Sequence, residues 1–286
     1  MKLLPILCAI VLISAQAWAD EDRFADTKIE SQTLAPGISM LTGQGGNIGV
    51  SAGDDGLLII DDQYAPLAER ISAKLAELHP PSQGKPRFII NTHHHGDHTG
   101  GNIHFAQDGT VFAHDNVRMN MQSNEVAAAA WPMVTFDKGI QFHFNGDTIK
   151  VFHGGIGHTD GDAMVYFEQA NVLHMGDLFF KDRFPFVDLN HGGSVREYLH
   201  RVEEALTLVN EQTQIIPGHG DMADKQDLAR FALMLGQSLE WAESHRGETL
   251  EQWRKRQLPE TLAGWEWGFI TKERWLETLW NEMQEH

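Results

Sequence analysis

Residues 92–98, Thr-His-His-His-Gly-Asp-His, place four imidazoles and a carboxylate in one short loop. This loop follows residues 87–91, a short apolar run with the character of a buried strand. His93 and His95 are two residues apart, so an extended backbone puts both side chains on one side. A loop that leaves a buried strand can direct several such side chains at one point. The spacing therefore predicts a metal-binding loop rather than a polar surface loop.

Further candidate ligands occur along the chain. Asp97 and His98 are placed to turn toward a second point. His158, Asp177 and His219 each lie in a glycine-containing turn that comes after a predicted strand. Together with the first loop, these residues are sufficient for two coordination spheres. Neutral imidazole and carboxylate suit Zn²⁺, whereas Ca²⁺ and Mg²⁺ prefer oxygen ligands; iron and manganese are also compatible with this set.

The order of predicted elements indicates two packed sheets with helices outside. The segments with strand character are residues 38–42, 47–52, 56–60, 87–91, 111–113, 139–144, 148–152, 163–167, 172–175 and 214–217. Helical spacing begins at Pro66 and ends at Pro80, and shorter or longer helices are expected at 116–122, 225–245 and 272–283. Ser194 and Glu197 form a capping-box pattern that starts another helix. We expect one domain.

The first 19 residues have the pattern of a secretory signal peptide. Lys2 precedes an apolar run, and Ala17-Trp18-Ala19 supplies the small-x-small cleavage pattern. The run is too short to span a bilayer core of about 30 Å. We therefore expect cleavage after Ala19, a mature domain at 20–286 without a membrane segment, and a periplasmic or secreted location.

Composition limits the possible partners and ligands. The only cysteine is Cys8, inside the predicted signal, so the mature chain has no thiolate ligand and no disulfide. The formal net charge is −18, and loss of Lys2 with the signal makes it −19. This acidity disfavours nucleic acid as a partner. A small-molecule substrate is expected, and the oligomeric state is left open.

The succession T-H-x-H-x-D-H, G-H-T, G-D and G-H resembles the metallo-β-lactamase superfamily over nearly the whole mature chain. The resemblance implies an α+β fold, a four-layered αββα sandwich with the site at one edge between the sheets. It also implies two zinc ions. His93, His95 and His158 resemble the ligands of the first zinc, Asp97, His98 and His219 those of the second, and Asp177 the bridging carboxylate.

The activity implied by this resemblance is hydrolysis of an amide, lactone or ester carbonyl. A hydroxide that bridges the two metals attacks the carbonyl carbon, and Asp97 orients this nucleophile. Lys181 is a candidate for binding a substrate carboxylate, and His191 is a candidate for facing the substrate. The apolar runs at 131–133 and 184–186 are candidate substrate walls.

β-Lactams are the leading substrate expectation, because residues 157–177 resemble the corresponding stretch of class B β-lactamases. Asp177 stands where many of those enzymes carry cysteine, and aspartate there is similar to glyoxalase II. The alternatives are therefore a glyoxalase II-like thioesterase or a lactonase. A mononuclear iron sulfur dioxygenase and a non-catalytic metal-binding accessory protein are the remaining alternatives.

Overall fold

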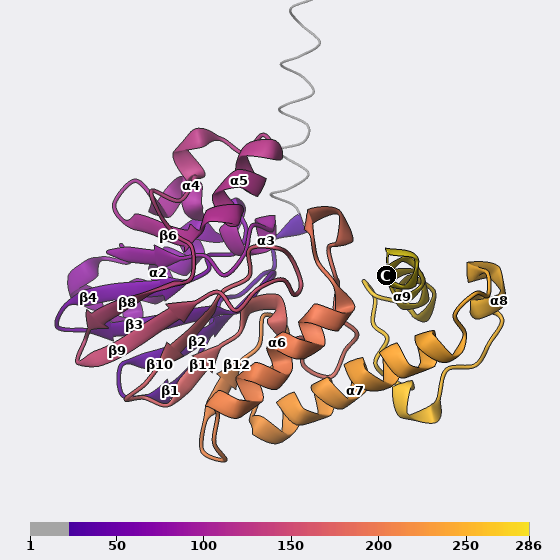
Figure 1. The fold of residues 1–286 in the computed structure, drawn as a ribbon. Helices are drawn as coiled ribbons and strands as arrows, with labels where there is room; N and C mark the ends of the chain where they lie inside the picture. Colours follow the sequence, from indigo (N-terminus) through magenta and orange to yellow (C-terminus); the bar gives the residue numbers. More distant parts are fainter. Residues whose placement is uncertain (1–22, 286) are drawn as a thin grey trace, which may run out of the picture.

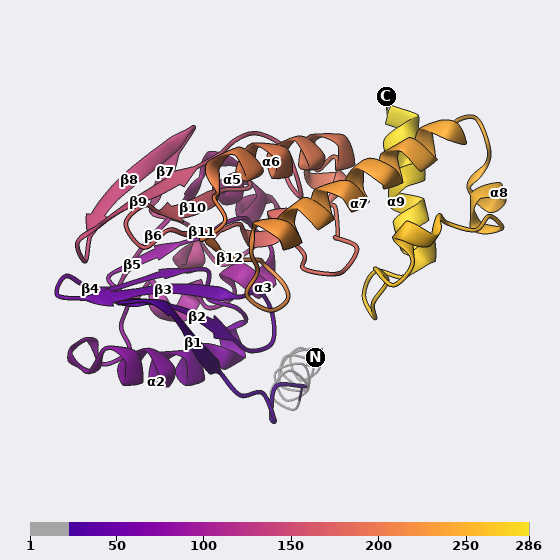
Figure 2. The same ribbon diagram turned by 90° about the horizontal axis from the view of Figure 1, so that it is seen from below.

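The computed structural model describes residues 23–285, so the predicted signal peptide at 1–19 lies outside the described residues. Two sheets pack face to face, with helices on both outer sides (Figures 1 and 2). The first sheet has the order β1 (Glu30–Ala35), β2 (Ile38–Thr42), β3 (Ile48–Gly53), β4 (Gly56–Ile60), β5 (Phe88–Ile90), β6 (Thr110–His114) and β7 (Val134–Phe136). The second has the order β12 (Gln214–Ile216), β11 (Val172–His174), β10 (Met164–Phe167), β9 (Asp147–Phe152) and β8 (Gly139–Phe144).

Side chains that alternate between the two faces of each strand explain the hydrophobic layers of the sandwich. On β4, Leu58 and Ile60 face the second sheet, whereas Leu57 and Ile59 face the outer helix α2 (Ala68–Leu78). Because successive side chains of a strand point to opposite faces, each strand of this kind contributes to two hydrophobic layers. Figure 2 shows α2 on one outer face and α6 (Val195–Leu208) on the other. The predicted αββα sandwich is confirmed.

The strand directions bring several loops to one edge. Strands β1 to β4 form an antiparallel meander, and β4 to β7 run parallel. In the second sheet, β11 and β12 are parallel and the other pairs are antiparallel. The carboxyl ends of β4, β5, β11 and β12 therefore open toward the same edge. Two short helices, α3 (Gly96–Thr99) and α4 (Asn102–Phe105), lie between β5 and β6, and α5 (Asp115–Ser123) follows β6.

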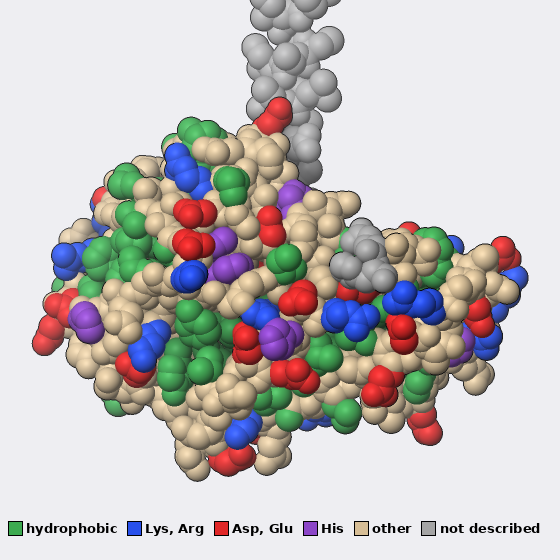
Figure 3. Space-filling model, in the orientation of Figure 1, with side chains coloured by type: hydrophobic (Ala, Val, Ile, Leu, Met, Phe, Trp, Pro, Cys, Tyr) green, Lys and Arg blue, Asp and Glu red, His purple; other side chains and the backbone are tan. Residues whose placement is uncertain are grey.

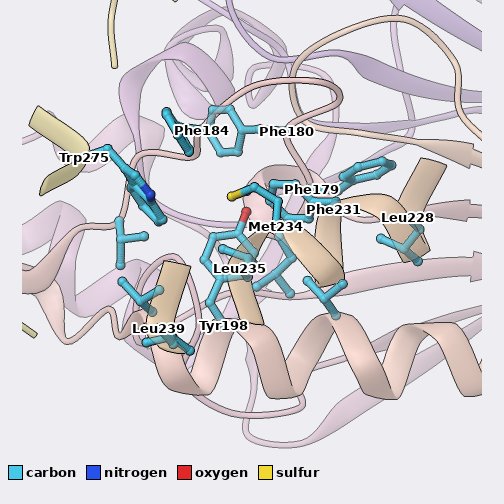
Figure 4. Close-up of a cluster of buried hydrophobic side chains, with 14 of the residues drawn as sticks. Phe179, Phe180, Phe184, Tyr198, Leu228, Phe231, Met234, Leu235, Leu239 and Trp275 are labelled. Carbon is cyan, nitrogen blue, oxygen red and sulfur yellow. The ribbon is translucent and has the colours of Figure 1, made fainter. Parts of the chain in front are cut away.

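The C-terminal helices form an extension of the outer layer on the second sheet. They are α7 (Lys225–Ser244), α8 (Leu250–Arg254) and α9 (Lys272–Glu285), and they project to one side of the sandwich (Figure 1). Their aromatic and aliphatic side chains pack with those of α6 and of the loop after β11 (Figure 4). Trp275 stacks on Phe184 with ring centroids 5.1 Å apart, and its indole N–H donates to Ser238 Oγ.

Most predicted elements are confirmed, and five of the named strands and α-helices were missed. They are strands β1 and β7 and the short helices α3, α4 and α8. The predicted capping box at the start of α6 is half formed: Ser194 Oγ accepts from the Glu197 backbone N–H, but the Ser194 backbone N–H donates to the Gly157 carbonyl rather than to the Glu197 side chain. Across the described residues, no helix has both the length and the hydrophobicity needed to cross a membrane.

Candidate metal centre

The first group of candidate ligands brings together three loops. His93 and His95 come from the loop after β5, His158 from the loop after β9, and Asp177 from the turn after β11. His158 Nε2 lies 2.9 Å from His95 Nδ1 and 3.5 Å from Asp177 Oδ2. His93 Nε2 lies 3.8 Å from the same Asp177 oxygen. These atoms all converge on one point, as the sequence predicted.

The second group lies on the other side of the Asp177 carboxylate. It contains Asp97, His98 and His219. His98 Nε2 and His219 Nε2 lie 3.0 and 3.4 Å from Asp177 Oδ1. His219 Nε2 is also 3.4 Å from Asp97 Oδ2. One oxygen of Asp177 therefore faces each group, which is the position that a bridging carboxylate requires.

Several buried polar atoms in this centre have no hydrogen-bond partner. They are His93 Nε2, His98 Nε2 and Asp177 Oδ1. A buried donor or acceptor without a partner is costly, and native proteins rarely keep one without a reason. The unpartnered atoms point at the two convergence points, and their imidazole and carboxylate chemistry matches the preferences of Zn²⁺. The residues present therefore fit a pair of zinc ions.

The electrostatics of the first group favour a bound cation. Burial alone would raise the pKa of Asp177, but the facing imidazoles of His98 and His219 hold that pKa well below its ordinary value. Burial lowers the pKa of His93 well below its ordinary value, and burial lowers that of His158 to about 4. An ionised carboxylate and neutral imidazoles are the forms that bind metal ions. In the second group, burial would lower the pKa of His219, but the Asp177 and Asp97 carboxylates raise it to about 9, so a metal ion bound there would displace a proton.

Asp61 positions one imidazole of each group, His98 directly and His93 through Thr92, and it was not predicted. Its buried carboxylate accepts hydrogen bonds from His98 Nδ1 at 2.7 Å and from the Thr92 backbone and hydroxyl, each at 2.8 Å. Thr92 Oγ1 in turn lies 3.0 Å from His93 Nδ1. Such outer contacts fix the orientation of ligand imidazoles. An acidic pair directly after the apolar strand 56–60 was the available signal in the sequence.

Asp188 positions His95 of the first group, and it was also not predicted. Its Oδ2 lies 2.9 Å from His95 Nε2 and 2.7 Å from His191 Nδ1. His158 is held separately, because its Nδ1 lies 2.7 Å from the Phe186 carbonyl. His94 lies outside the two ligand groups, with its ring 4.6 Å from that of His191. His191 thus contacts the carboxylate that positions His95.

A cleft of about 490 Å³ opens over the centre. The metal-centre side chains His95, Asp97, Asp177 and His219 form its polar part. Its other lining residues are Arg23, Gln44, Gly45, Tyr64, Phe180, Phe186, Trp267 and Phe269. Phe186, from the predicted wall at 184–186, is among them, but neither Lys181 nor His191 is.

Lys181 and the predicted wall at 131–133 lie elsewhere. Lys181 Nζ forms an ion pair with Asp227 at 2.9 Å and donates to the Met222 carbonyl. Trp131 packs on the small cluster around α5, and its indole N–H donates to the Val126 carbonyl. Phe184 is buried against Trp275 in the outer layer. The structure therefore places these residues in packing contacts outside the cleft.

Figure 3 shows acidic and basic side chains of the described residues interspersed on the displayed face. The formal net charge of the whole chain is −18.

Comparison with known sequences identifies the family. A sequence model described as the metallo-beta-lactamase superfamily matches residues 41–219, which is more than half of the chain and contains both ligand groups. The protein belongs to the metallo-β-lactamase superfamily, whose members are mostly hydrolases. Solved structures agree in fold. The DIM-1 metallo-beta-lactamase superposes with a TM-score of 0.63 at 16% identity, covering 74% of this chain and 100% of that chain.

The curated relatives are diverse and distant. Hydroxyacylglutathione hydrolase of Nitrosococcus oceani is 30% identical over 46% of this chain and 47% of that protein. Metallo-beta-lactamase type 2 of Bacillus sp. (strain 170) is 22% identical over 59% and 65%, respectively. The 2,4-dinitroanisole O-demethylase subunit alpha of Nocardioides sp. (strain JS1661) is 27% identical over 45% and 39%. Each match spans less than two thirds of the relative's own length.

Proposed function

We propose that this protein is an exported binuclear zinc hydrolase that cleaves an amide, lactone or ester carbonyl, with β-lactams as the leading substrates. The observation that carries the proposal is the position of Asp177. Its two carboxylate oxygens face two separate groups of imidazoles at the floor of one cleft. A structural zinc site is usually closed off by its ligands, whereas His95, Asp97, Asp177 and His219 line an open cleft, which leaves room for a reactant.

Seven residues would hold the zinc ions. His93, His95 and His158 would hold one, Asp97, His98 and His219 the other, and Asp177 both. When bound, such ions lower the pKa of water to about 7 and polarise a substrate carbonyl. The chain's own contribution is to fix these ligands through buried contacts, in particular those of Asp61 and Asp188.

Asp97 has a second role, which is to orient the attacking nucleophile. Its carboxylate lines the cleft. Burial would raise the pKa of Asp97, but His98 and His219 bring it below its ordinary value. The carboxylate is therefore ionised and can accept a proton. An ionised carboxylate at this place can orient an attacking water and accept its proton.

Two substrate classes share this chemistry. The likeness to metallo-beta-lactamase type 2 supports a β-lactam. Asp177 as the shared ligand and the likeness to hydroxyacylglutathione hydrolase support a thioester or lactone as the second candidate. The export that we propose from the signal pattern at 1–19 favours the β-lactam over a glutathione thioester, which is a cytosolic substrate.

The test is chelator-sensitive ring opening by the zinc-loaded mature chain. We expect opening of a penicillin or carbapenem, loss of turnover with a chelator, and loss of turnover in His93→Ala and Asp97→Ala. Lactone or thioester turnover without β-lactam opening selects the second candidate. Bound metal with no hydrolysis across all these substrates would contradict the proposal and favour an accessory metal-binding protein. A single iron ion would favour the sulfur dioxygenase.

A further inference from the structure

The cleft over the metal centre is walled by aromatic rings. Five side chains other than histidine supply them: Tyr64, Phe180, Phe186, Trp267 and Phe269. The wall comes close to the reacting end of the cleft. The ring of Phe186 lies 5.6 Å from that of His95, and the ring of Trp267 lies 6.5 Å from that of His219. A group bound between these rings therefore lies close to a carbonyl at the centre.

Two of these rings come from the segment between α8 and α9. Trp267 and Phe269 follow residue 219, where the match to the superfamily ends. They are thus specific to the C-terminal extension of this chain rather than to the matched domain. Specificity in folds of this kind is supplied by segments added around a common site.

Trp267 is held in a fixed position. Its indole N–H donates to the Phe184 carbonyl at 2.9 Å, and its backbone N–H donates to the Ile270 carbonyl at 3.0 Å. The Arg183 guanidinium lies over its ring, 5.1 Å from the centroid. A ring fixed in this way loses little conformational freedom when a ligand binds against it.

Phe269 keeps an apolar surface open to the cleft. Its side chain is 50% exposed. The Arg274 guanidinium lies 4.1 Å from its ring centroid, and the Phe186 ring lies 5.8 Å from it. An exposed phenylalanine that lines a concave site together with four other rings marks a surface that a ligand covers.

We infer that the substrate carries an arylacetyl-type group, with its aromatic ring held between Trp267, Phe186 and Phe269. The assignment rests on the proposed carbonyl hydrolysis, because it places the aryl group beside the reacting carbonyl. Offset or edge-to-face stacking against such rings discriminates an aryl group from a small alkyl group.

The first test is binding of phenylacetate and acetate to the zinc-loaded protein by isothermal titration calorimetry. Both acids carry the same carboxylate, so their difference reports the aryl group. We expect phenylacetate to bind at least about tenfold more tightly, since each ring contact contributes roughly twofold to tenfold. Trp267→Ala and Phe269→Ala should each reduce this preference by a similar factor, and Trp267→Phe should keep most of it.

Trp131→Ala is the matched control. Trp131 is also half-buried, donates its indole N–H to a backbone carbonyl, and has an arginine over its ring, but it does not line the cleft. Zinc content and thermal unfolding of each variant show whether it is folded. Equal affinity for the two acids, or a preference unchanged in both Trp267→Ala and Phe269→Ala, would overturn the inference.

A second experiment, which measures turnover, separates this inference from the proposed function. The substrates are phenylacetyl and acetyl forms of one β-lactam or lactone nucleus. Binding preference without opening of either form contradicts the hydrolysis and leaves the aryl subsite standing. Opening of both forms at equal kcat/KM, with equal affinity for the two acids, overturns the aryl subsite and leaves the hydrolysis standing.

Discussion

Two glycines allow the backbone to approach the ligand side chains. A Cβ on Gly218 would lie 2.0 Å from Asp177 Oδ1, and a Cβ on Gly46 would lie 2.1 Å from the His98 ring. Real side chains do not tolerate such distances. The sequence motif G-H around His219 therefore has a second purpose, because its glycine makes room for the shared carboxylate.

We predict that Gly218→Ala displaces the Asp177 carboxylate and reduces zinc content to one ion per chain or fewer, although every ligand is retained. Gly96→Ala is the control: it lies between ligands in the first loop, but a Cβ there meets nothing within 4 Å. Elemental analysis of both variants after zinc loading checks this. Full zinc content in Gly218→Ala would show that Asp177 is not held as described.

Asp61 gives a second prediction at this scale. Asp61→Asn removes an ionised acceptor from His98 Nδ1, so the imidazole is less well oriented and less basic. We expect affinity for one of the two zinc ions to fall about tenfold to hundredfold. Competition with a fluorescent zinc chelator measures this, and an unchanged affinity for both ions would refute a supporting role for Asp61.

Local patterns predicted the ligand loops but not the residues that support them. All seven ligand candidates lie in short motifs next to apolar strands, and the resemblance of these motifs to the superfamily suggested their roles. Asp188 contacts His95 across 93 positions of the chain, and no local pattern marks it. Trp267 and Phe269 reach the cleft only through the packing of the C-terminal helices. Lys181 was proposed from its nearness to Asp177 in sequence, whereas its ammonium contacts Asp227.

At the scale of elements, alternating or helical apolar spacing predicted most strands and helices. The two missed strands lack such a pattern. Strand β1 is a mostly exposed edge strand with the sequence ESQTLA, and β7 has three residues. The half-formed capping box at α6 has a different cause, since the Ser194 backbone N–H donates to the Gly157 carbonyl, which only the tertiary fold brings there.

Glu282 of α9 joins the C-terminal extension to the sandwich. Its buried carboxylate accepts from Ser194 Oγ at 2.8 Å and from the Val195 and Arg196 backbone N–H groups at the start of α6. These donors have no partner within the helix itself, and a carboxylate is favoured at this helix end.

We therefore expect Glu282→Ala to lower the free energy of unfolding by about 2–3 kcal/mol, because it leaves buried donors unpaired. Glu277→Ala on the same helix is the control. Glu277 is exposed and its pair with Arg254 at 3.4 Å is a surface pair, so its loss should cost less than about 1 kcal/mol. Urea denaturation of both variants measures the difference, and equal effects would rule out the capping role.

At the scale of the whole molecule, the metal centre joins loops from both sheets. Ligands from the loops after β5, β9, β11 and β12 meet only in the folded chain, so metal binding stabilises the fold. At free zinc a thousandfold above Kd, one site contributes about 4 kcal/mol. We predict that a chelator lowers the melting temperature by roughly 10 °C, as measured by calorimetry. A melting temperature that does not respond to a chelator would contradict metal-linked stability.

The most direct test of a two-metal centre is the zinc content of the purified mature chain after loading and removal of free metal. The two ligand groups on either side of Asp177 predict two zinc ions per chain, falling to one in His219→Ala. A wild-type content of one ion or none would contradict a centre in which Asp177 is shared.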